Sequence, residues 1–477
     1  MKPAIHRLGT LVLALLALLL PPAGLASQVR AGSSPLRVLI LTGAGTHDWK
    51  ITAPLLRQLL DDTGRFETRI CETPAGISAP TLAPFDVVVD DYLGPRLGKD
   101  AEKAIEEFVK SGKGLIVLHS ALMAFNDSKD RVWPGFFKMT KVTWPTSPAN
   151  EIELPFRVFP IQITREDHPI TRGAKTNWHT GDRPLGDFTL KAGAEVLATT
   201  ARGEPLVFAS THGKGRVVGI ALGHDQAARQ EKAFITLFDR GTEWAASGQV
   251  TLPAEIGLPE PNTNAVRVLI ITGGHDHFAS FYALFSGYKD LGRAPVSESR
   301  MAFQEDLRPK YDVIVMYDFS RDLEDKGKKN LRDFVEAGKG VVVLHHGILN
   351  YQKWPWWYEE VVGGRYRLSR ENGIPNSTVK MGEEHLITPV QGHPITAGIG
   401  PFHVIDETYH GLFIAPGIQP LLTTDNPTSD RVVGWVGPCT TSRVVFLQLG
   451  HDHSPFRHPS YRALVHNSIL WTAGRLN

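Results

Sequence analysis

Histidines gather at three places in the second half of this 477-residue chain. Each cluster follows a run of apolar residues that has the length of a buried strand. The clusters read GGHDH at 273–277, HHG at 345–347 and GHDH at 450–453. Imidazole transfers protons near neutral pH, and together with carboxylates it binds transition metals. The clusters therefore indicate acid–base chemistry or a metal site, if the fold brings them together.

The elements around these clusters occur twice, at an offset of about 225–230 residues and in the same order. We interpret the pattern as a tandem duplication of one domain. The matching pairs are RVLILTGAGTHDW (37–49) with RVLIITGGHDHF (267–278), FVKSGKGLIVLH (108–119) with FVEAGKGVVVLH (334–345), HPIT (168–171) with HPIT (393–396), and ALGHD (221–225) with QLGHD (448–452).

The duplication sets the expected boundaries. Residues 36–248 form the first copy, 249–265 a linker rich in Pro and small polar residues, and 266–475 the second copy. Residues 1–26 have the order of a signal peptide, with Lys2 and Arg7 before the apolar run LVLALLALLL and small residues after it. We therefore expect an exported protein, periplasmic or extracellular, with no membrane span after cleavage near Ala26.

Strands alternate with helices in each copy, which predicts an α/β fold with a doubly wound parallel sheet. In such sheets, ligands bind beyond the carboxyl ends of the strands. All three histidine clusters follow predicted strands of the second copy, so we expect its site there. The helices are expected at 328–339 and 461–473 in the second copy, and at 234–246 in the first.

Residue types suggest individual roles at this site. DETYH (406–410), in a segment predicted to be a loop, adds acids and a phenol, and WPWWYEE (354–360) adds flat aromatic faces that suit sugar rings. A packed lid or a domain contact is the alternative for that aromatic tract. We expect catalysis by His346, His451 and Glu407, and substrate binding by His275, Asp276, His345, Trp354, Trp357, Asp406, Tyr409 and Asp452.

A metal is a separate hypothesis, because no HExxH or CxxC spacing fixes one. A divalent transition metal would draw its ligands from the strand-end residues His275, His277, His345, His346, His451 and Asp452. The alternative is that single histidines only hydrogen-bond loop backbones.

The first copy is poorer in polar residues at these places. It retains His47, His119 and His224, but GDRPL (181–185) stands opposite DETYH, with Asp182 paired to Glu407 and Pro184 to Tyr409. The simplest interpretation is one working copy and one degraded or repurposed copy, and the rival is a different substrate in the first.

Composition excludes some classes. A formal net charge of +1 without dense runs of Lys and Arg argues against a nucleic-acid partner. The first-strand loops lack a full GxGxxG, which argues against a nicotinamide dehydrogenase.

The second copy resembles the ThuA-like (trehalose utilisation) family through TGGHDH, VVVLHHGILNYQKWPWW, VGGRY, HPITAGI, DETYHGLFIAPG, LLTTDNPTS and LGHDHSPFRHPSYRALV. The first copy is similar but departs at GDRPL. The resemblance implies two tandem flavodoxin-like domains of the class I glutamine amidotransferase type and a link to sugar utilisation. Neither Cys71 nor Cys439 stands near the turn after a central strand, so glutamine amidotransferase activity is not expected.

Together, these features predict an exported protein that acts on a carbohydrate or oxidised-sugar derivative in its second copy, by hydrolysis, elimination or isomerisation. The alternatives are a non-catalytic carbohydrate-binding protein and a metal-dependent sugar hydrolase or lyase.

Overall fold

The computed structural model describes residues 34–125, 132–144, 154–175, 178–258, 263–292, 294–319 and 322–477. The predicted leader, residues 1–26, lies outside these ranges. Within them, no helix combines the length and apolar character that a membrane crossing requires.

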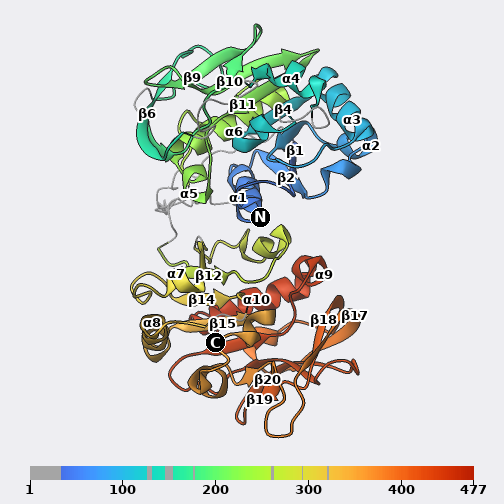
Figure 1. Cartoon of the computed structure of the whole chain (residues 1–477), viewed down its shortest axis with the longest axis vertical. Helices are drawn as coiled ribbons and strands as arrows, with labels where there is room; N and C mark the ends of the chain where they lie inside the picture. Colours follow the sequence, from blue (N-terminus) through green and yellow to red (C-terminus); the bar gives the residue numbers. More distant parts are fainter. Residues whose placement is uncertain are drawn as a thin grey trace, which may run out of the picture. The chain divides into compact units, whose positions relative to one another are not determined.

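Two nine-stranded sheets form the framework, one in each copy (Figure 1). Among the described residues, no strand of one sheet pairs with a strand of the other. In spatial order the first sheet consists of β2 (Phe66–Cys71), β1 (Leu36–Leu41), β3 (Val87–Asp90), β4 (Gly114–Leu118), β11 (Gly215–Ile220), β10 (Pro205–His212), β9 (Glu195–Thr200), β6 (Arg157–Ile163) and β7 (His179–Asp182).

The second sheet repeats this order. Its strands are β13 (Val296–Glu298), β12 (Val268–Thr272), β14 (Val313–Met316), β15 (Gly340–Leu344), β22 (Val444–Leu447), β21 (Val432–Val436), β20 (Gln419–Thr424), β17 (Thr378–Pro389) and β18 (Phe402–His410). The first five strands of each sheet pair in parallel, and the last four extend it antiparallel. The predicted α/β fold class is therefore confirmed, with an antiparallel extension that the sequence did not predict.

The extension corrects one expectation. DETYH is not a loop but the end of β18, and its residues 406–409 are all buried. The strand pairs with β17, with Asp406 opposite Glu383 and Tyr409 opposite Val379. Four consecutive buried residues break the alternation that normally reveals a strand, because part of the set faces the interior of the site rather than solvent.

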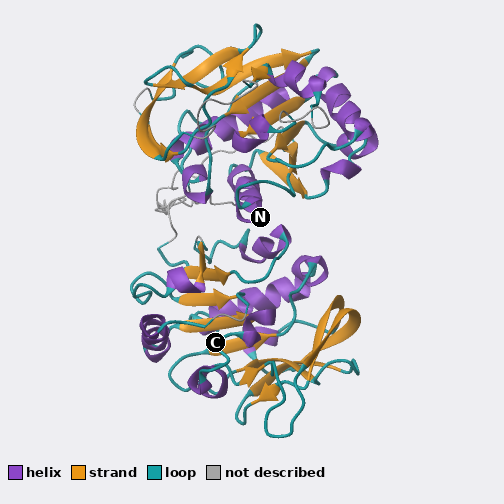
Figure 2. Ribbon diagram, viewed as in Figure 1, coloured by secondary structure: helices purple, strands orange, loops and turns teal. Residues whose placement is uncertain are grey.

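Helices cover both faces of each sheet (Figure 2), and the strands alternate their side chains between two cores. In the first copy, Val38 and Ile40 of β1 join the core beneath α6 (Lys232–Ser247), whereas Leu39 and Leu41 join the one beneath α3 (Lys99–Lys110). Apolar runs buried on both faces are the pattern from which the parallel strands were predicted.

The predicted helices of the second copy are also present. Helix α8 (Asp325–Glu336) buries Leu331, Phe334 and Val335, and Gly338 follows it with a φ of 74°. The closing helix α10 (Pro459–Thr472) packs on β15 and matches α6 of the first copy. Cys71 and Cys439 are both free thiols.

Part of the predicted linker packs on the first copy. The guanidinium of Arg240 donates to the carbonyls of Leu252 and Pro253, both at 2.8 Å. The hydroxyl of Thr236 donates to the carbonyl of Ile256 at 2.9 Å. The described residues 251–258 therefore cover α6.

Candidate functional site

A strained turn places a histidine at the centre of each copy. His345 directly follows β15 with a φ of 46°, and His119 directly follows β4 with a φ of 40°. The left-handed region costs a residue with a side chain on the order of 1–3 kcal/mol and persists only where the surroundings enforce it. Such strain at matching strand ends indicates that the position of this ring matters in both copies.

The ring of His345 has a defined orientation. Its Nδ1 lies 2.7 Å from the carbonyl oxygen of Gln448, which can only accept, so Nδ1 carries a proton. Its Nε2 then faces the hydroxyl of Tyr409 at 2.9 Å and the carboxylate of Glu407 at 3.3 Å. His345 is fully buried, and its Nε2 is directed toward these two residues of β18.

Glu407 joins two histidines. Its Oε2 lies 3.3 Å from Nε2 of His345, and its Oε1 lies 3.1 Å from Nε2 of His451, in the loop after β22. The side chains of Glu407 and His451 retain 11% and 18% exposure, so this side of the cluster is not fully closed to solvent. Three of the predicted site residues thus meet at the carboxyl ends of strands, where the topology placed them.

Opposite charges set the protonation states of this pair. Burial opposes a charged imidazolium, but the Glu407 hydrogen bond and the charges of Asp406 and Glu407 raise the pKa of His345. Burial likewise opposes the Glu407 carboxylate, but its hydrogen bond to His345 lowers the pKa of that carboxyl. Burial and the charge of His345 lower the pKa of His451. The site therefore pairs a histidine whose pKa is raised, His345, with one whose pKa is lowered, His451.

Asp406 holds the loop that carries His451 in place. Its buried carboxylate accepts the backbone N–H groups of Gly450 and His451, at 2.7 and 2.9 Å. Burial raises the pKa of this carboxyl to about 6, against the opposing effect of His345 and these hydrogen bonds. Asp406, predicted to bind substrate, instead holds the loop that carries His451.

His346 and His275 complete a ring of histidines. The His346 ring centroid lies 5.2 Å from that of His345 and 4.9 Å from that of His275, which in turn is 5.5 Å from that of His451. His346 is buried, and Nε2 donates to the carbonyl of Tyr317 at 3.0 Å. Burial lowers the pKa of His346 far below its ordinary value, so this ring is neutral. Among the described residues its buried Nδ1 has no hydrogen-bond partner.

Two of the six expected metal ligands converge. His345 and His451, with Glu407, offer atoms that all lie within 4.8 Å of one another. His277 instead bonds the Tyr282 hydroxyl at 2.9 Å, and Asp452 caps α9 (His453–Arg457) by accepting the N–H of Ser454. The ligand set that the structure supports therefore contains Glu407, which the sequence assigned only to catalysis. Two histidines and a carboxylate suit a divalent transition metal.

One of the two tryptophans predicted to bind substrate lies in the core. Trp357 is 1% exposed and packs in the core of the second copy. Trp354 lies against Trp356, and the Arg332 guanidinium of α8 covers the Trp356 ring at 4.1 Å. Trp357 is therefore a packing residue, the alternative considered for this tract, because its buried ring cannot stack on a sugar. Asp276, expected to orient substrate, has a 91% exposed side chain.

Other partly exposed aromatic rings lie beside the histidines. Phe319 is 5.5 Å from His275 and 5.8 Å from His346, and Tyr366 is 5.4 Å from Tyr409, by ring centroids. Neither residue stands out in the sequence, although Tyr366 belongs to the VGGRY motif and Phe319 follows the end of β14. These rings could contact the apolar face of a sugar at the site.

The structure revises the pairing of the two copies. Asp182 accepts the N–H groups of Gly223 and His224 at 2.7 and 3.2 Å, the arrangement that Asp406 makes in the second copy. Asp182 therefore matches Asp406, not Glu407 as predicted from the sequence. In this register Arg183 takes the place of Glu407, and Leu185 takes the place of Tyr409. The acid of the second copy is thus absent from the first.

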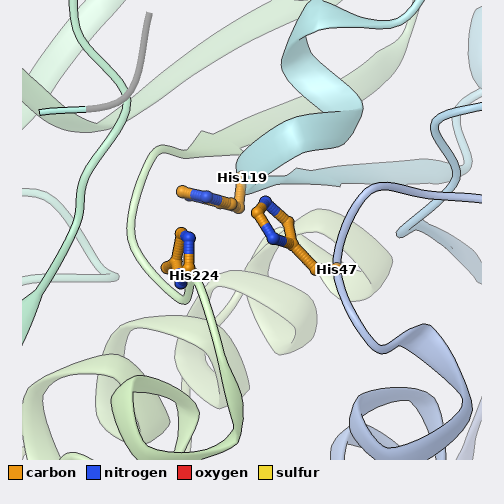
Figure 3. A group of neighbouring side chains, drawn as sticks. All are labelled: His47, His119 and His224. Carbon is orange, nitrogen blue, oxygen red and sulfur yellow. The ribbon is translucent and has the colours of Figure 1, made fainter. Parts of the chain in front are cut away.

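The first copy, interpreted from the sequence as degraded or repurposed, nevertheless keeps a histidine cluster. His47, His119 and His224 come from three separate segments and turn toward one another (Figure 3). Their ring centroids are 4.3–5.5 Å apart, and one ligand atom from each lies within 4.8 Å of the others. Burial lowers the pKa of His119 well below its ordinary value. The signal was present in THD (46–48), LH (118–119) and GHD (223–225), which match the motifs of the second copy.

Several solved structures are similar to part of this chain. The chain is similar to a ThuA-like protein from Parabacteroides merdae, with 25% identity over 46% of this chain and 93% of that one and a TM-score of 0.40. A ThuA-like protein from Bacteroides uniformis is also similar, with 16% identity over 47% of this chain and 98% of that one and a TM-score of 0.38. So is a glutamine amidotransferase from Thermotoga maritima, with 15% identity over 45% of this chain and 100% of that one and a TM-score of 0.32. No curated protein matches the chain significantly.

The family model described as trehalose utilisation, ThuA, matches residues 37–245 and again residues 267–472, which together make up most of the chain. The chain therefore belongs to the ThuA family and carries two ThuA domains in tandem.

Proposed function

We propose that this protein is an exported enzyme that acts on a carbohydrate or an oxidised-sugar derivative in its second copy. The observation that carries the proposal is the placement of Glu407 between His345 and His451, at 3.3 and 3.1 Å, on a partly open site. The family's description, trehalose utilisation, supports a sugar as the substrate class. The chain order of charged, apolar and small residues at 1–26 supports export.

The reaction fits acid–base chemistry. Neutral His451 accepts a proton from water or from a carbon next to a carbonyl, and Glu407 holds the imidazolium that results. Charged His345, with the Tyr409 hydroxyl beside it, stabilises or protonates an oxygen of the substrate. Hydrolysis, elimination and isomerisation of a sugar all need this pair of proton movements. Tyr366 and Phe319 would contact the sugar ring, and polar groups would bind its hydroxyls.

The predicted role of His346 is also part of the proposal. Its Nδ1 is the buried nitrogen without a hydrogen-bond partner in the described structure, and its ring lies beside His275 and His345. A neutral imidazole that keeps a lone pair in a buried site is suited to accept a proton from a substrate. His275, exposed at the mouth of this ring of histidines, would contact the substrate first.

A metal-dependent version is the second candidate, because His345, Glu407 and His451 also form a ligand set. A divalent metal bound there would polarise a substrate oxygen or activate water. These three residues would then hold the ion, and His346 rather than His451 would act as the base. No nucleic-acid partner is proposed.

The test is a substrate screen of the purified protein with trehalose, other disaccharides and their keto derivatives. Turnover followed by NMR, with and without a chelator, separates the two enzymatic versions: only the metal-dependent one loses activity with chelator. Saturable sugar binding without turnover would favour a carbohydrate-binding protein and contradict the proposal.

A further inference from the structure

The geometry points to a zinc-type metal site in the first copy, formed by His47, His119 and His224. This inference goes beyond the proposed function, because it concerns the copy that lacks the acid of the second site. The three histidines lie at the carboxyl ends of strands: after β1, after β4 and after β11. Their ligand atoms all lie within 4.8 Å of one another.

His119 is the best-defined of these ligands. Its Nδ1 lies 3.0 Å from the carbonyl oxygen of Ala221, which fixes the proton on Nδ1 and leaves the Nε2 lone pair available. The residue is completely buried, and in the described structure Nε2 has no hydrogen-bond partner. A metal-ligating histidine typically donates its other ring N–H to a backbone carbonyl in this way.

The neighbours of that lone pair are two more imidazoles. The ring of His119 lies 5.1 Å from that of His47 and 5.5 Å from that of His224. In the second copy the corresponding Nε2, on His345, meets a hydroxyl and a carboxylate instead. In the first copy, Arg183 and Leu185 follow β7 and take the places of Glu407 and Tyr409, so these two positions offer His119 neither a carboxylate nor a hydroxyl.

The loop that carries His224 is held by buried polar groups. Asp182 accepts the N–H groups of Gly223 and His224, and Arg229 donates to the carbonyl of Gly223 at 2.9 Å. The charge of Arg229 is balanced by Asp91, whose carboxylate accepts two hydrogen bonds from it, both 2.8 Å. The Arg229 guanidinium therefore adds no unbalanced positive charge beside a bound metal ion.

Three imidazoles match the ligand preference of zinc, which also leaves a fourth position for water or a ligand. At Zn–N distances of about 2.0–2.1 Å, tetrahedral ligand atoms lie about 3.3 Å apart, so the rings need to close in by about 1.5 Å at most. His47 and His224 are only partly buried, so side-chain rotation can supply this movement and the site can be reached from solvent.

The experiment isolates the first site by disabling the second. The full chain, purified without a histidine tag and carrying Glu407→Gln and His451→Ala, is stripped with chelator and titrated with Zn²⁺. We expect one Zn²⁺ per chain. With Co²⁺ in place of Zn²⁺, X-ray absorption should show three imidazole nitrogens.

Adding His224→Ala to this background removes a ligand and should weaken Zn²⁺ binding by more than about 100-fold. Loss of a residue that only hydrogen-bonds a ligand typically costs roughly 10- to 100-fold. His224 is partly exposed, so its replacement leaves the core intact, whereas His119→Ala requires a check of folding. His179→Ala, at an exposed histidine of β7, is the matched control and should bind normally. Absence of stoichiometric Zn²⁺ in the background chain, or equal affinity in His224→Ala and His179→Ala, would overturn the inference. Neither result depends on turnover in the second copy.

Discussion

The carboxylate of Glu407 lies 3.1 Å from Nε2 of His451, although the two residues come from an antiparallel edge strand and from the loop after a parallel strand. The antiparallel half of the sheet thus supplies the acid, and the parallel half supplies the histidines. The site exists only because the chain returns across the sheet, which a purely parallel fold would not do.

Replacing Glu407 by Gln should reduce turnover by on the order of 100- to 10,000-fold, the usual cost of losing a positioned acid or base. The amide keeps the size of the side chain but cannot carry the charge that stabilises His345. Turnover on the substrate found by the screen is the measurement. Glu384→Gln, at an exposed acid of the adjacent strand β17, is the control and should retain activity. Equal losses in both variants would contradict this role of Glu407.

The pH profile of kcat/KM should be bell-shaped. His451 works as a neutral base, and its pKa lies below 6.5, so the acidic limb should fall below pH 6.5. His345 works as a charged acid, and its pKa lies above 6.5, so activity should be lost above pH 6.5 as that proton leaves. In Glu407→Gln the carboxylate that raises the pKa of His345 is gone. The alkaline limb of the residual activity should therefore shift to lower pH. An unmoved alkaline limb would show that another group sets it.

Asp406 and Asp182 should prove equivalent in stability but not in activity. Each accepts two backbone N–H groups from the loop that carries a site histidine, and a buried donor without an acceptor costs about 1–3 kcal/mol. Asp406→Ala and Asp182→Ala should therefore lower the melting temperature by similar amounts, with exposed Asp425→Ala as the unchanged control. Only Asp406→Ala should also reduce turnover, because it releases His451. A large loss of turnover in Asp182→Ala alone would place the active site in the first copy.

Aromatic residues of the second copy should divide into core and site. Trp357→Ala should lower the free energy of unfolding by about 3–5 kcal/mol, as for other buried aromatic residues. The milder Trp357→Phe should leave KM unchanged, whereas Tyr366→Ala should raise it. Binding and thermal unfolding measured on the same samples separate these effects. A raised KM in a stably folded Trp357→Phe variant would restore the stacking role that the sequence suggested.

Much of this architecture follows from the sequence. Runs such as VLII and VVVL are apolar throughout, which is expected only of strands buried on both faces, and the spacing of Leu331, Phe334 and Val335 predicts α8. Once the sheet is parallel, residues after β12, β15 and β22 share one edge. The meeting of His275, His345, His346 and His451 was therefore predictable without a structure.

The remaining features depend on long-range pairing. The strand β18 contains consecutive polar residues that are buried only because β17 and the loop after β22 lie against them. One residue of register decides whether Asp182 matches Asp406 or Glu407, and only the hydrogen bonds to Gly223 and His224 show which. Likewise, the composition of WPWWYEE cannot tell which ring faces the core.

The most direct test compares turnover of the sugar identified by the screen in His451→Ala and in His224→Ala, which remove matching histidines of the two copies. The account predicts a loss on the order of 100-fold or more in His451→Ala and near-normal turnover in His224→Ala, with both variants folded by thermal unfolding. Loss of turnover in His224→Ala with normal turnover in His451→Ala would contradict the assignment of the active site to the second copy.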